Sequence, residues 1–264
     1  MNNISLFGNR KLALLLGAAL VWMGASNLSA QGADKPADLE PGFTQIFNGK
    51  DLNGWDGDPK FWSVRDGAIV GQSTDKNPVE KNTFIIWSGG EVKDFVLRFD
   101  YRVTGNNPDK WGNSGVQYRA KRVDPKGWGL HGYQADIDTP VFFTGILYEE
   151  GGREILSLRG ESTLMGKDKV TKTVLPNEET NLEAISNSLK EKIRLEDWNS
   201  YSVRVETLED SSCRMTHTIN GHLMTSVVDA TGKGATSGLL GFQLHQGQSM
   251  TVEYKNIRIK PLNK

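Results

Sequence analysis

A strict two-residue alternation of apolar and polar side chains recurs in several separate segments of this chain. The clearest example runs from Phe95 to Val103, where every second residue is Phe, Leu, Tyr or Val and three of the residues between them are charged. Successive side chains of a β-strand point to opposite faces, so this pattern predicts a half-buried strand. The same spacing returns at Tyr201–Val205 and at Cys213–Ile219, and the latter segment ends at Asn220-Gly221, a strong hairpin signal.

Further strands are expected at Leu239–Leu244 and Val252–Ile259. The 29 glycines of the chain supply turns between short strands. Many short alternating strands with glycine-rich turns are typical of an all-β fold, here a two-sheet antiparallel jelly-roll sandwich. We expect a single domain over residues 43–264.

The segment Glu161–Arg194 interrupts the alternation. It is polar and rich in lysine, and apolar residues at helical spacing follow Thr180 and Glu183, which fit a capping box. The segment is therefore interpreted as an inserted surface loop with one short helix. It is either a lid over a cleft or simply a solvated insertion.

The first thirty residues have the pattern of a secretory signal peptide. Arg10 and Lys11 precede the apolar run Leu12–Ala25, which is shorter than the roughly 20 residues that cross a membrane, and Ala30 offers a small residue for cleavage. Residues 31–42 form a polar leader. We expect an exported protein, periplasmic or secreted, without a lipid anchor, because no cysteine directly follows the apolar run.

Charge and cysteine content narrow the set of partners. Without residues 1–30, 31 − 2 = 29 basic residues stand against 32 acidic ones, a net charge of −3. A weakly acidic surface argues against nucleic acid and anionic membranes as partners. The single cysteine, Cys213, leaves no intrachain disulfide and is expected to be a small buried residue. Nothing in the sequence indicates the oligomeric state.

Two alternating segments place polar side chains together on one strand face. In Gly132–Asp138 one face carries Tyr133, Ala135 and Ile137, and the other carries Gln134, Asp136 and Asp138. In Val116–Ala120, Gln117 and Arg119 share a face. If the two strands pair, they form a polar floor of amides, carboxylates and a guanidinium, as expected for a carbohydrate cleft.

A set of short motifs follows in a specific order along the chain. Together these motifs resemble the 3-keto-disaccharide hydrolase domain family, over roughly Gly42 to Leu262. The resemblance implies a concanavalin A-like lectin/glucanase sandwich, export, and action on glycosides or disaccharides oxidised at the sugar C3. The motifs are Phe47–Trp55, Trp62–Ile69, Asn113–Arg119, Gly132–Gln134, Trp198–Tyr201, Asn220-Gly221 and Lys255–Ile259.

A ketone at C3 acidifies the hydrogen on C2, so the substituent at C1 can leave by elimination and water can then add. Such a site needs a base, a donor to the developing enolate oxygen, and an acid near the leaving oxygen. We expect Asp136 to be the base, Arg119 the donor and His245 a proton shuttle. For Asp136 and Arg119 the alternative is a cross-strand ion pair, and for His245 it is a half-buried, hydrogen-bonded histidine.

Other candidates are assigned to substrate binding. Trp111 and Trp128 lie in polar loops, where an exposed aromatic ring can contact sugar C–H groups. The turn around Gly145–Arg153 either covers the cleft or forms a charged hairpin tip. The expected substrate-binding residues are Gln134, Asp138, Gln117, Asn113, Trp111, Trp128, Tyr148, Glu149 and Arg153.

The remaining patterns concern the core, a metal site and the class of protein. His217 alternates with core residues and is expected at the core edge. No cofactor is expected, although Asp136, Asp138 and Glu149 offer oxygen ligands for Ca²⁺. The Glu-x-Asp-x-x-Glu pattern of laminarinase-like enzymes is missing, because Gln134 stands where the first Glu is expected. The rival to an enzyme is a non-catalytic carbohydrate-binding module of the same fold.

Overall fold

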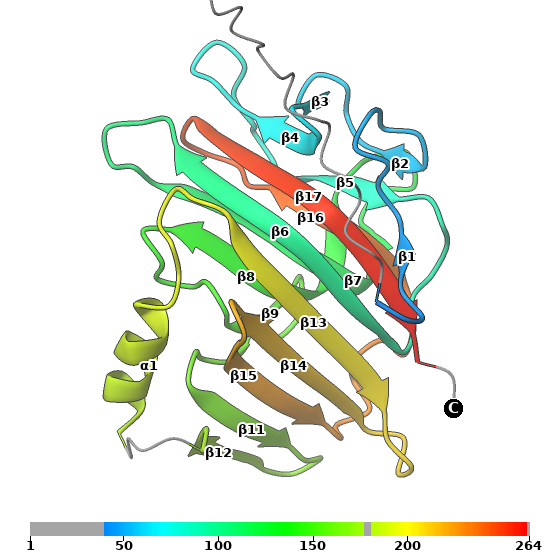
Figure 1. The fold of residues 1–264 in the computed structure, drawn as a ribbon. Coiled ribbons are helices and arrows are strands. Elements are labelled where there is room, and N and C mark those ends of the chain that lie inside the picture. Colours follow the sequence, from blue (N-terminus) through cyan, green and yellow to red (C-terminus); the bar gives the residue numbers. More distant parts are fainter. Residues whose placement is uncertain (1–39, 177–180, 263–264) are drawn as a thin grey trace, which may run out of the picture. The chain divides into compact units, whose positions relative to one another are not determined.

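The alternating segments pair into two stacked sheets in a computed structural model that describes residues 40–176 and 181–262 (Figure 1). These residues belong to one compact unit, Leu39–Lys264. The expected signal peptide and all but the last residues of the polar leader lie outside the described residues. No helix in the described part of the chain is long and apolar enough to cross a membrane.

The first sheet has ten strands, and we call it sheet A. Its order is β12 (Val170–Val174), β11 (Glu161–Met165), β15 (His222–Asp229), β14 (Cys213–Ile219), β13 (Asn199–Thr207), β6 (Phe95–Gly105), β17 (Met250–Pro261), β4 (Ala68–Gln72) and β3 (Trp62–Arg65), with β1 (Thr44–Gln45) also paired to β17. Its neighbours are antiparallel, apart from the parallel pair β11 and β15.

The second sheet, sheet B, has seven strands and carries the candidate site. Its order is β10 (Glu154–Ser157), β9 (Leu147–Glu150), β8 (Leu130–Thr139), β7 (Gly112–Arg122), β16 (Leu239–Leu244), β5 (Thr83–Trp87) and β2 (Trp55–Asp56). Its paired strands are all antiparallel. The expected all-β, two-sheet jelly-roll architecture is therefore confirmed.

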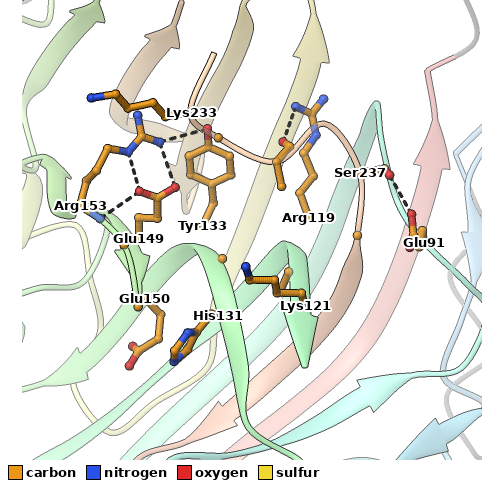
Figure 2. Close-up of a pocket in the computed structure, with 17 residues that line it drawn as sticks. Glu91, Arg119, Lys121, His131, Tyr133, Glu149, Glu150, Arg153, Lys233 and Ser237 are labelled. Carbon is orange, nitrogen blue, oxygen red and sulfur yellow. Dashed lines mark hydrogen bonds and ion pairs between the residues drawn. The ribbon is translucent and has the colours of Figure 1, made fainter. Parts of the chain in front are cut away.

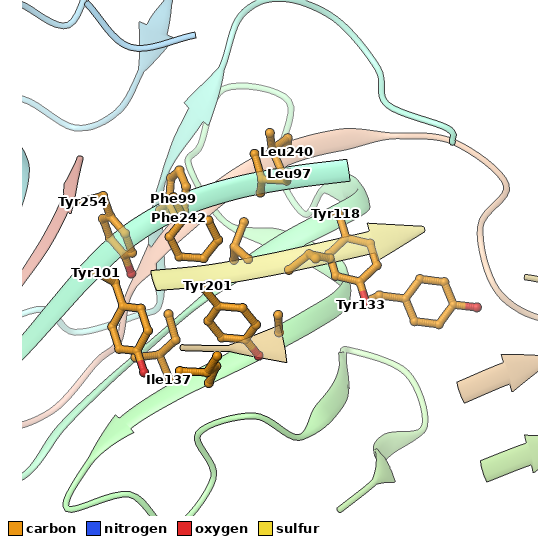
Figure 3. Packing of buried hydrophobic residues seen from close by; sticks show 14 of the residues in the cluster. Leu97, Phe99, Tyr101, Tyr118, Tyr133, Ile137, Tyr201, Leu240, Phe242 and Tyr254 are labelled. Atoms are coloured by element: carbon orange, nitrogen blue, oxygen red, sulfur yellow. The ribbon is translucent and has the colours of Figure 1, made fainter. Parts of the chain in front are cut away.

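The core fills the space between the sheets, as the alternation predicts. Phe99 and Tyr201 from sheet A stack at 5.4 Å, and Phe242 from sheet B meets Phe99 edge-on at 5.0 Å (Figure 3). Aromatic pairs at these separations add stability beyond the buried apolar area. The predicted hairpin at Asn220-Gly221 is also confirmed, because both residues have the positive φ angles, 50° and 83°, of a two-residue turn.

Cys213, which was expected to be buried, and His217, which was expected at the core edge, both lie inside the core. Cys213 is buried. The side chain of His217 is fully buried, its Nδ1 lies 3.1 Å from the Ile146 carbonyl, and its Nε2 lies 3.0 Å from the Tyr118 hydroxyl. Burial lowers the pKa of His217 to about 3, so the ring is neutral near pH 7. From β14 of sheet A, it therefore bonds a buried hydroxyl of sheet B and a buried carbonyl of the loop before β9.

The inserted segment is more ordered than expected. Its first part forms β11 and β12, which extend sheet A. The alternation is weak there because β12 is an exposed edge strand without a buried face. Helix α1 (Leu182–Lys190) follows as predicted, but its N-cap is Asn181, which accepts from the Glu183 amide, and the Thr180 predicted to cap it lies outside the described residues.

Helix α1 is packed into the protein. Ile185 and Leu189 of α1 are buried in the core, and Arg159 donates to the Ser186 carbonyl of the helix. This packing explains the helical spacing and argues against a purely solvated insertion. None of the described residues between 161 and 194 lines the cleft discussed below, so the lid interpretation finds no support there either.

Candidate functional site

The outer face of sheet B, which points away from the core, carries the predicted polar floor. Tyr133, Ala135 and Ile137 of β8 point into the core, which leaves Gln134, Asp136 and Asp138 on the other face. Strands β7 and β8 pair as predicted, with Gln117 opposite Gln134, Gly115 opposite Asp136 and Asn113 opposite Asp138.

Glycine at position 115 keeps the floor open beside Asp136. A Cβ atom placed on Gly115 would lie 2.8 Å from Cγ and 2.9 Å from Cδ of Gln134. Such contacts are closer than packed atoms tolerate, so any side chain here would displace the Gln134 amide. The missing side chain therefore lets Gln134 lie flat across the neighbouring strand and reach Asp136.

A short chain of amides leads to the Asp136 carboxyl. Gln117 Nε2 donates to Gln134 Oε1 at 3.0 Å, and Gln134 Nε2 donates to Asp136 Oδ1 at 2.9 Å. No cation contacts Asp136 in the part of the chain that the structure describes. Burial raises the pKa of Asp136 to about 8, and the charges of Asp138 and Glu150 act in the same direction.

Asp136 opens into a cleft of about 290 Å³, near the lower end of the usual volumes of ligand pockets. Five of the residues predicted for the site line it, namely Asn113, Gln134, Asp136, Tyr148 and His245. The remaining lining residues, which the sequence analysis did not select, are Asn82, Phe143, Ile146, Glu150, Ile155 and Gln246.

Glu150 could have been found by the alternation itself. On β9, Tyr148 lies opposite Gln134 and Glu150 lies opposite Gly132, so both point to the outer face of sheet B. Glu149 lies between them and must point to the other face. Of these two residues, both expected to bind substrate, only Tyr148 therefore lines the cleft.

His245 lies at the opposite side of the cleft, directly after β16. Its Nδ1 is 2.6 Å from the Gln246 carbonyl, and its ring meets Trp111 edge-on at 5.5 Å. A donor bond from Nδ1 leaves Nε2 free to exchange a proton with a ligand. Trp111 is half-buried against the core and supports His245 instead of lining the cleft.

The predicted contact between Arg119 and Asp136 is wrong. Arg119 has a φ angle of 47° and occupies a β-bulge, where the register of β7 and β8 shifts between Tyr118 and Lys121. A bulge inserts one extra residue and redirects the side chains that follow. The Arg119 guanidinium instead meets Asp94 at 3.0 Å and also donates to the Thr207 hydroxyl.

Glu149 and Arg153 belong to a second, larger cavity of about 490 Å³, which Arg119 also lines (Figure 2). Arg153 contacts Glu149 at 2.5 Å and Asp229 at 2.7 Å, and the Tyr133 hydroxyl donates to Asp229 at 2.6 Å. The guanidinium groups of Arg119 and Arg153 are thus already paired with carboxylates. The smaller cleft is the better candidate because its buried carboxyl lacks such a partner.

Asp138 holds a loop in place instead of facing the cleft. Its carboxylate accepts hydrogen bonds from the backbone amides of Phe142, Phe143 and Thr144 at 2.7–2.9 Å. The Thr144 hydroxyl donates to the same carboxylate at 2.7 Å. Asp138, which was expected to bind substrate, therefore does not line the cleft, and its carboxylate is used to hold this loop.

Two further predicted residues lie outside the cleft. Trp128 donates from Nε1 to Asp56 at 2.8 Å and lines a separate cavity. Gln117 is fully buried beneath the floor and acts through Gln134. Buried amide atoms of Asn113, Gln117 and Gln243 have no partner among the described residues, which marks this floor as unusually polar for a packed sheet.

The structure does not bring the suggested Ca²⁺ ligands together. Asp138 is bound to its loop, and Glu149 points to the other face of β9. The described residues contain no group of three or more His, Cys, Asp or Glu side chains placed to hold a metal ion.

Two sequence comparisons, one with protein families and one with single proteins, give related descriptions. A family model described as the 3-keto-alpha-glucoside-1,2-lyase-like domain matches residues 42–260. A protein of Bacteroides thetaiotaomicron named 3-keto-disaccharide hydrolase is 30% identical over 102 residues, which are 34% of this chain and 31% of that protein. The match therefore spans about a third of the length of this curated relative.

Two solved structures share the fold. One is a candidate glycosyl hydrolase from Parabacteroides distasonis, with 16% identity, a TM-score of 0.50, and 83% of this chain and 99% of that chain covered. The other is a protein of unknown function with a galectin-like fold from Bacillus subtilis, with 11% identity, a TM-score of 0.50, and 83% and 94% covered. At these identities the likeness concerns the fold alone.

The raised pKa of Asp136 predicts a pH-dependent effect of Asp136→Asn on stability. The folded protein keeps this proton up to about pH 8, whereas the ordinary aspartate value is 3.8, so the carboxyl destabilises the fold increasingly as the pH rises between these values. Asn can still accept from Gln134 but does not titrate. We expect the free energy of unfolding of Asp136→Asn, relative to wild type, to increase by about 1.4 kcal/mol per pH unit between pH 5 and 8.

Urea unfolding at pH 5, 6, 7 and 8 measures this difference. Asp168→Asn, at an exposed turn, is the control for the loss of a carboxyl group elsewhere in the chain. A difference for Asp136→Asn that is the same at all four pH values would show that Asp136 is ionised in the folded protein.

Arg119 is expected to stabilise the fold without affecting Asp136. Arg119→Met leaves the mostly buried Asp94 carboxylate without its cation, so we expect the free energy of unfolding to fall by about 3 kcal/mol. Neutralising the partner as well, in Arg119→Met/Asp94→Asn, should recover part of this loss. If Arg119→Met instead alters the pH-dependent effect of Asp136→Asn, the two side chains are coupled and their separation here is wrong.

Proposed function

Because this chain belongs to the 3-keto-alpha-glucoside-1,2-lyase-like domain family, we propose that it cleaves glycosides oxidised at C3 by elimination across C1 and C2. The observation that carries the proposal is Asp136, a buried carboxyl with a raised pKa that opens into a cleft of suitable size. A carboxylate that is a strong base is what removal of a carbon-bound proton needs.

The first step is proton removal from C2. Asp136 takes the proton, and the electron pair of the C2–H bond forms a C2=C3 double bond while the C3 carbonyl becomes an enolate. Asn113 lines the cleft next to Asp136 on the neighbouring strand, and we assign its side-chain amide as the donor to the enolate oxygen. The Gln117–Gln134 chain keeps the Asp136 carboxyl in place.

The second step is loss of the leaving group. The enolate reforms the C3 carbonyl, its electrons form a C1=C2 double bond, and the bond from C1 to the glycosidic oxygen breaks. His245, across the cleft from Asp136, is assigned as the acid that gives a proton to the departing oxygen. Addition of water across C1=C2 then completes a net hydrolysis.

A direct assay uses a 4-nitrophenyl glucoside oxidised at C3 and follows release of 4-nitrophenol. We expect turnover by the wild type, at least a hundred-fold lower kcat for Asp136→Asn, and little change for Arg119→Met. If proton removal from C2 limits the rate, kcat/KM should rise with pH up to about 8, because Asp136 must first lose its own proton. Deuterium at C2 of the substrate should slow the reaction if C–H cleavage limits the rate.

The outcomes separate the enzyme from its rival. Turnover that is absent in the wild type, or unchanged in Asp136→Asn, contradicts the mechanism. Binding of the oxidised sugar without turnover would favour the carbohydrate-binding module, which the polar floor and the galectin-like fold also suit.

We also propose that the protein is exported, on the basis of the basic pair and apolar run in its first thirty residues. Expression of the full chain with a C-terminal tag in a Gram-negative host, followed by fractionation, is expected to give a periplasmic protein shortened by about 30 residues. A full-length product in the cytoplasm would contradict export.

A further inference from the structure

One wall of the Asp136 cleft is apolar, in contrast to its floor. The floor presents Asn113, Gln134, Asp136 and Glu150, whereas Phe143 and Ile155 form the wall together with the ring of Tyr148. The wall belongs to the loop between β8 and β9, to β9 and to the start of β10. A ligand in this cleft therefore meets polar groups on one side and hydrocarbon on the other.

The wall is directly next to Asp136. The chain leaves β8 after Thr139 and returns where the Gly145 amide donates to the Asp136 carbonyl at 3.0 Å. If Asp136 removes the C2 proton, C1 is only one bond away. The group attached to C1 then lies in the cleft that this loop also lines.

Residues 139–144, which we call the Phe loop, are held firmly although two of their side chains are exposed. Asp138 accepts three backbone amides of the loop, and Arg159 donates to the Thr144 carbonyl at 2.7 Å. Val141 is buried with a φ angle of 69°, a conformation that costs energy for a β-branched residue. A loop fixed in this way presents its phenyl rings in a defined place.

The exposure of the apolar side chains is itself unusual. Phe143 is 41% exposed and Ile155 42% exposed, and both line the cleft. Apolar surface left in water forgoes the stabilisation that burial provides, and a contiguous apolar surface at a binding cleft indicates a ligand that covers it. Phe142 is 62% exposed on the same loop but does not line the cleft.

We propose that Phe143 and Ile155 form the subsite for the leaving group, and that it accepts an aromatic or aliphatic aglycone in preference to a second sugar. This inference rests on the proposed function, because it assigns the cleft floor to the oxidised sugar. A second sugar on this wall would find hydrogen-bond partners only at the Tyr148 hydroxyl and at Glu150, whereas a phenyl ring would cover Phe143 and Ile155 and be covered by them.

The test compares two substrates that share the oxidised glucose. One carries a 2-naphthyl aglycone and the other is a disaccharide, both oxidised at C3 of the glucose. We expect the wild type to have a kcat/KM at least tenfold higher for the naphthyl glycoside. Phe143→Ala and Ile155→Thr should each lower this value by three- to tenfold and change that of the disaccharide less than twofold.

Phe142→Ala is the matched control, since it removes the same ring from the same loop outside the cleft. It should leave both values of kcat/KM unchanged. Ile155→Thr keeps the branch at Cβ but removes the terminal methyl group and adds a hydroxyl, and it lies on β10, so it tests the wall without altering the Phe loop. Equal losses for both substrates in Phe143→Ala would mean that the wall contacts the oxidised sugar, and would overturn the proposal, as would no loss.

A binding measurement keeps this inference separate from the proposed function. Calorimetry with Asp136→Asn compares the naphthyl glycoside with the methyl glycoside, again both oxidised at C3. At least tenfold tighter binding of the naphthyl compound, reduced by adding Phe143→Ala, supports the apolar subsite even if the wild type turns over neither substrate. Equal affinities overturn the subsite, whereas missing turnover alone overturns only the proposed chemistry.

Discussion

The register between β7 and β8 is the constraint on which the site depends. It places Gly115 opposite Asp136 and Gln117 opposite Gln134, so that one strand supplies space and the other supplies functional groups. A shift by one residue would move Asp136 into the core and bring Ala135 to the surface. The register is fixed from the other side of the sheet, where Tyr133, Ala135 and Ile137 pack into the core. The same apolar residues that stabilise the sandwich therefore position the polar ones.

Alternation alone was sufficient to predict the fold and most of the floor. It assigned the buried faces of β6, β13 and β14, and it put Gln134 and Asp136 together on the face opposite the core. It failed at Arg119, because the bulge depends on how β7 meets its neighbours and leaves no clear mark in one strand. The alternation also gave no sign that the Asp138 carboxylate accepts hydrogen bonds from its own loop, since this depends on the path of the chain after the strand ends. The position of Glu150 on the outer face, in contrast, could be predicted from the sequence once the face of Tyr148 was known.

A comparison of the Arg153 cavity with the Asp136 cleft shows why charge pairing distinguishes a structural network from a reactive site. In the larger one, Arg153 lies between Glu149 and Asp229, and the pairing offsets the cost of burying these charges. This network joins β9 of sheet B to β15 of sheet A. Its charged groups are already paired with one another, so few of them can bind a ligand. In the smaller cleft, Asp136 accepts a hydrogen bond from one amide. Burial disfavours its charged form, and its pKa is therefore raised. The larger volume is therefore the weaker indication of function.

Asp136 and Asp138 are two residues apart on one strand face and have opposite roles, and each role supports the other. Three backbone amides surround the Asp138 carboxylate, which fixes the Phe loop and with it the apolar wall of the cleft. The negative charge of Asp138 also adds to the effect of burial on Asp136 and raises its pKa further. The Asp138 carboxylate thus fixes the wall that would receive the leaving group, and it makes Asp136 a stronger base. This coupling accounts for a second aspartate beside the first, where charge repulsion alone would disfavour it.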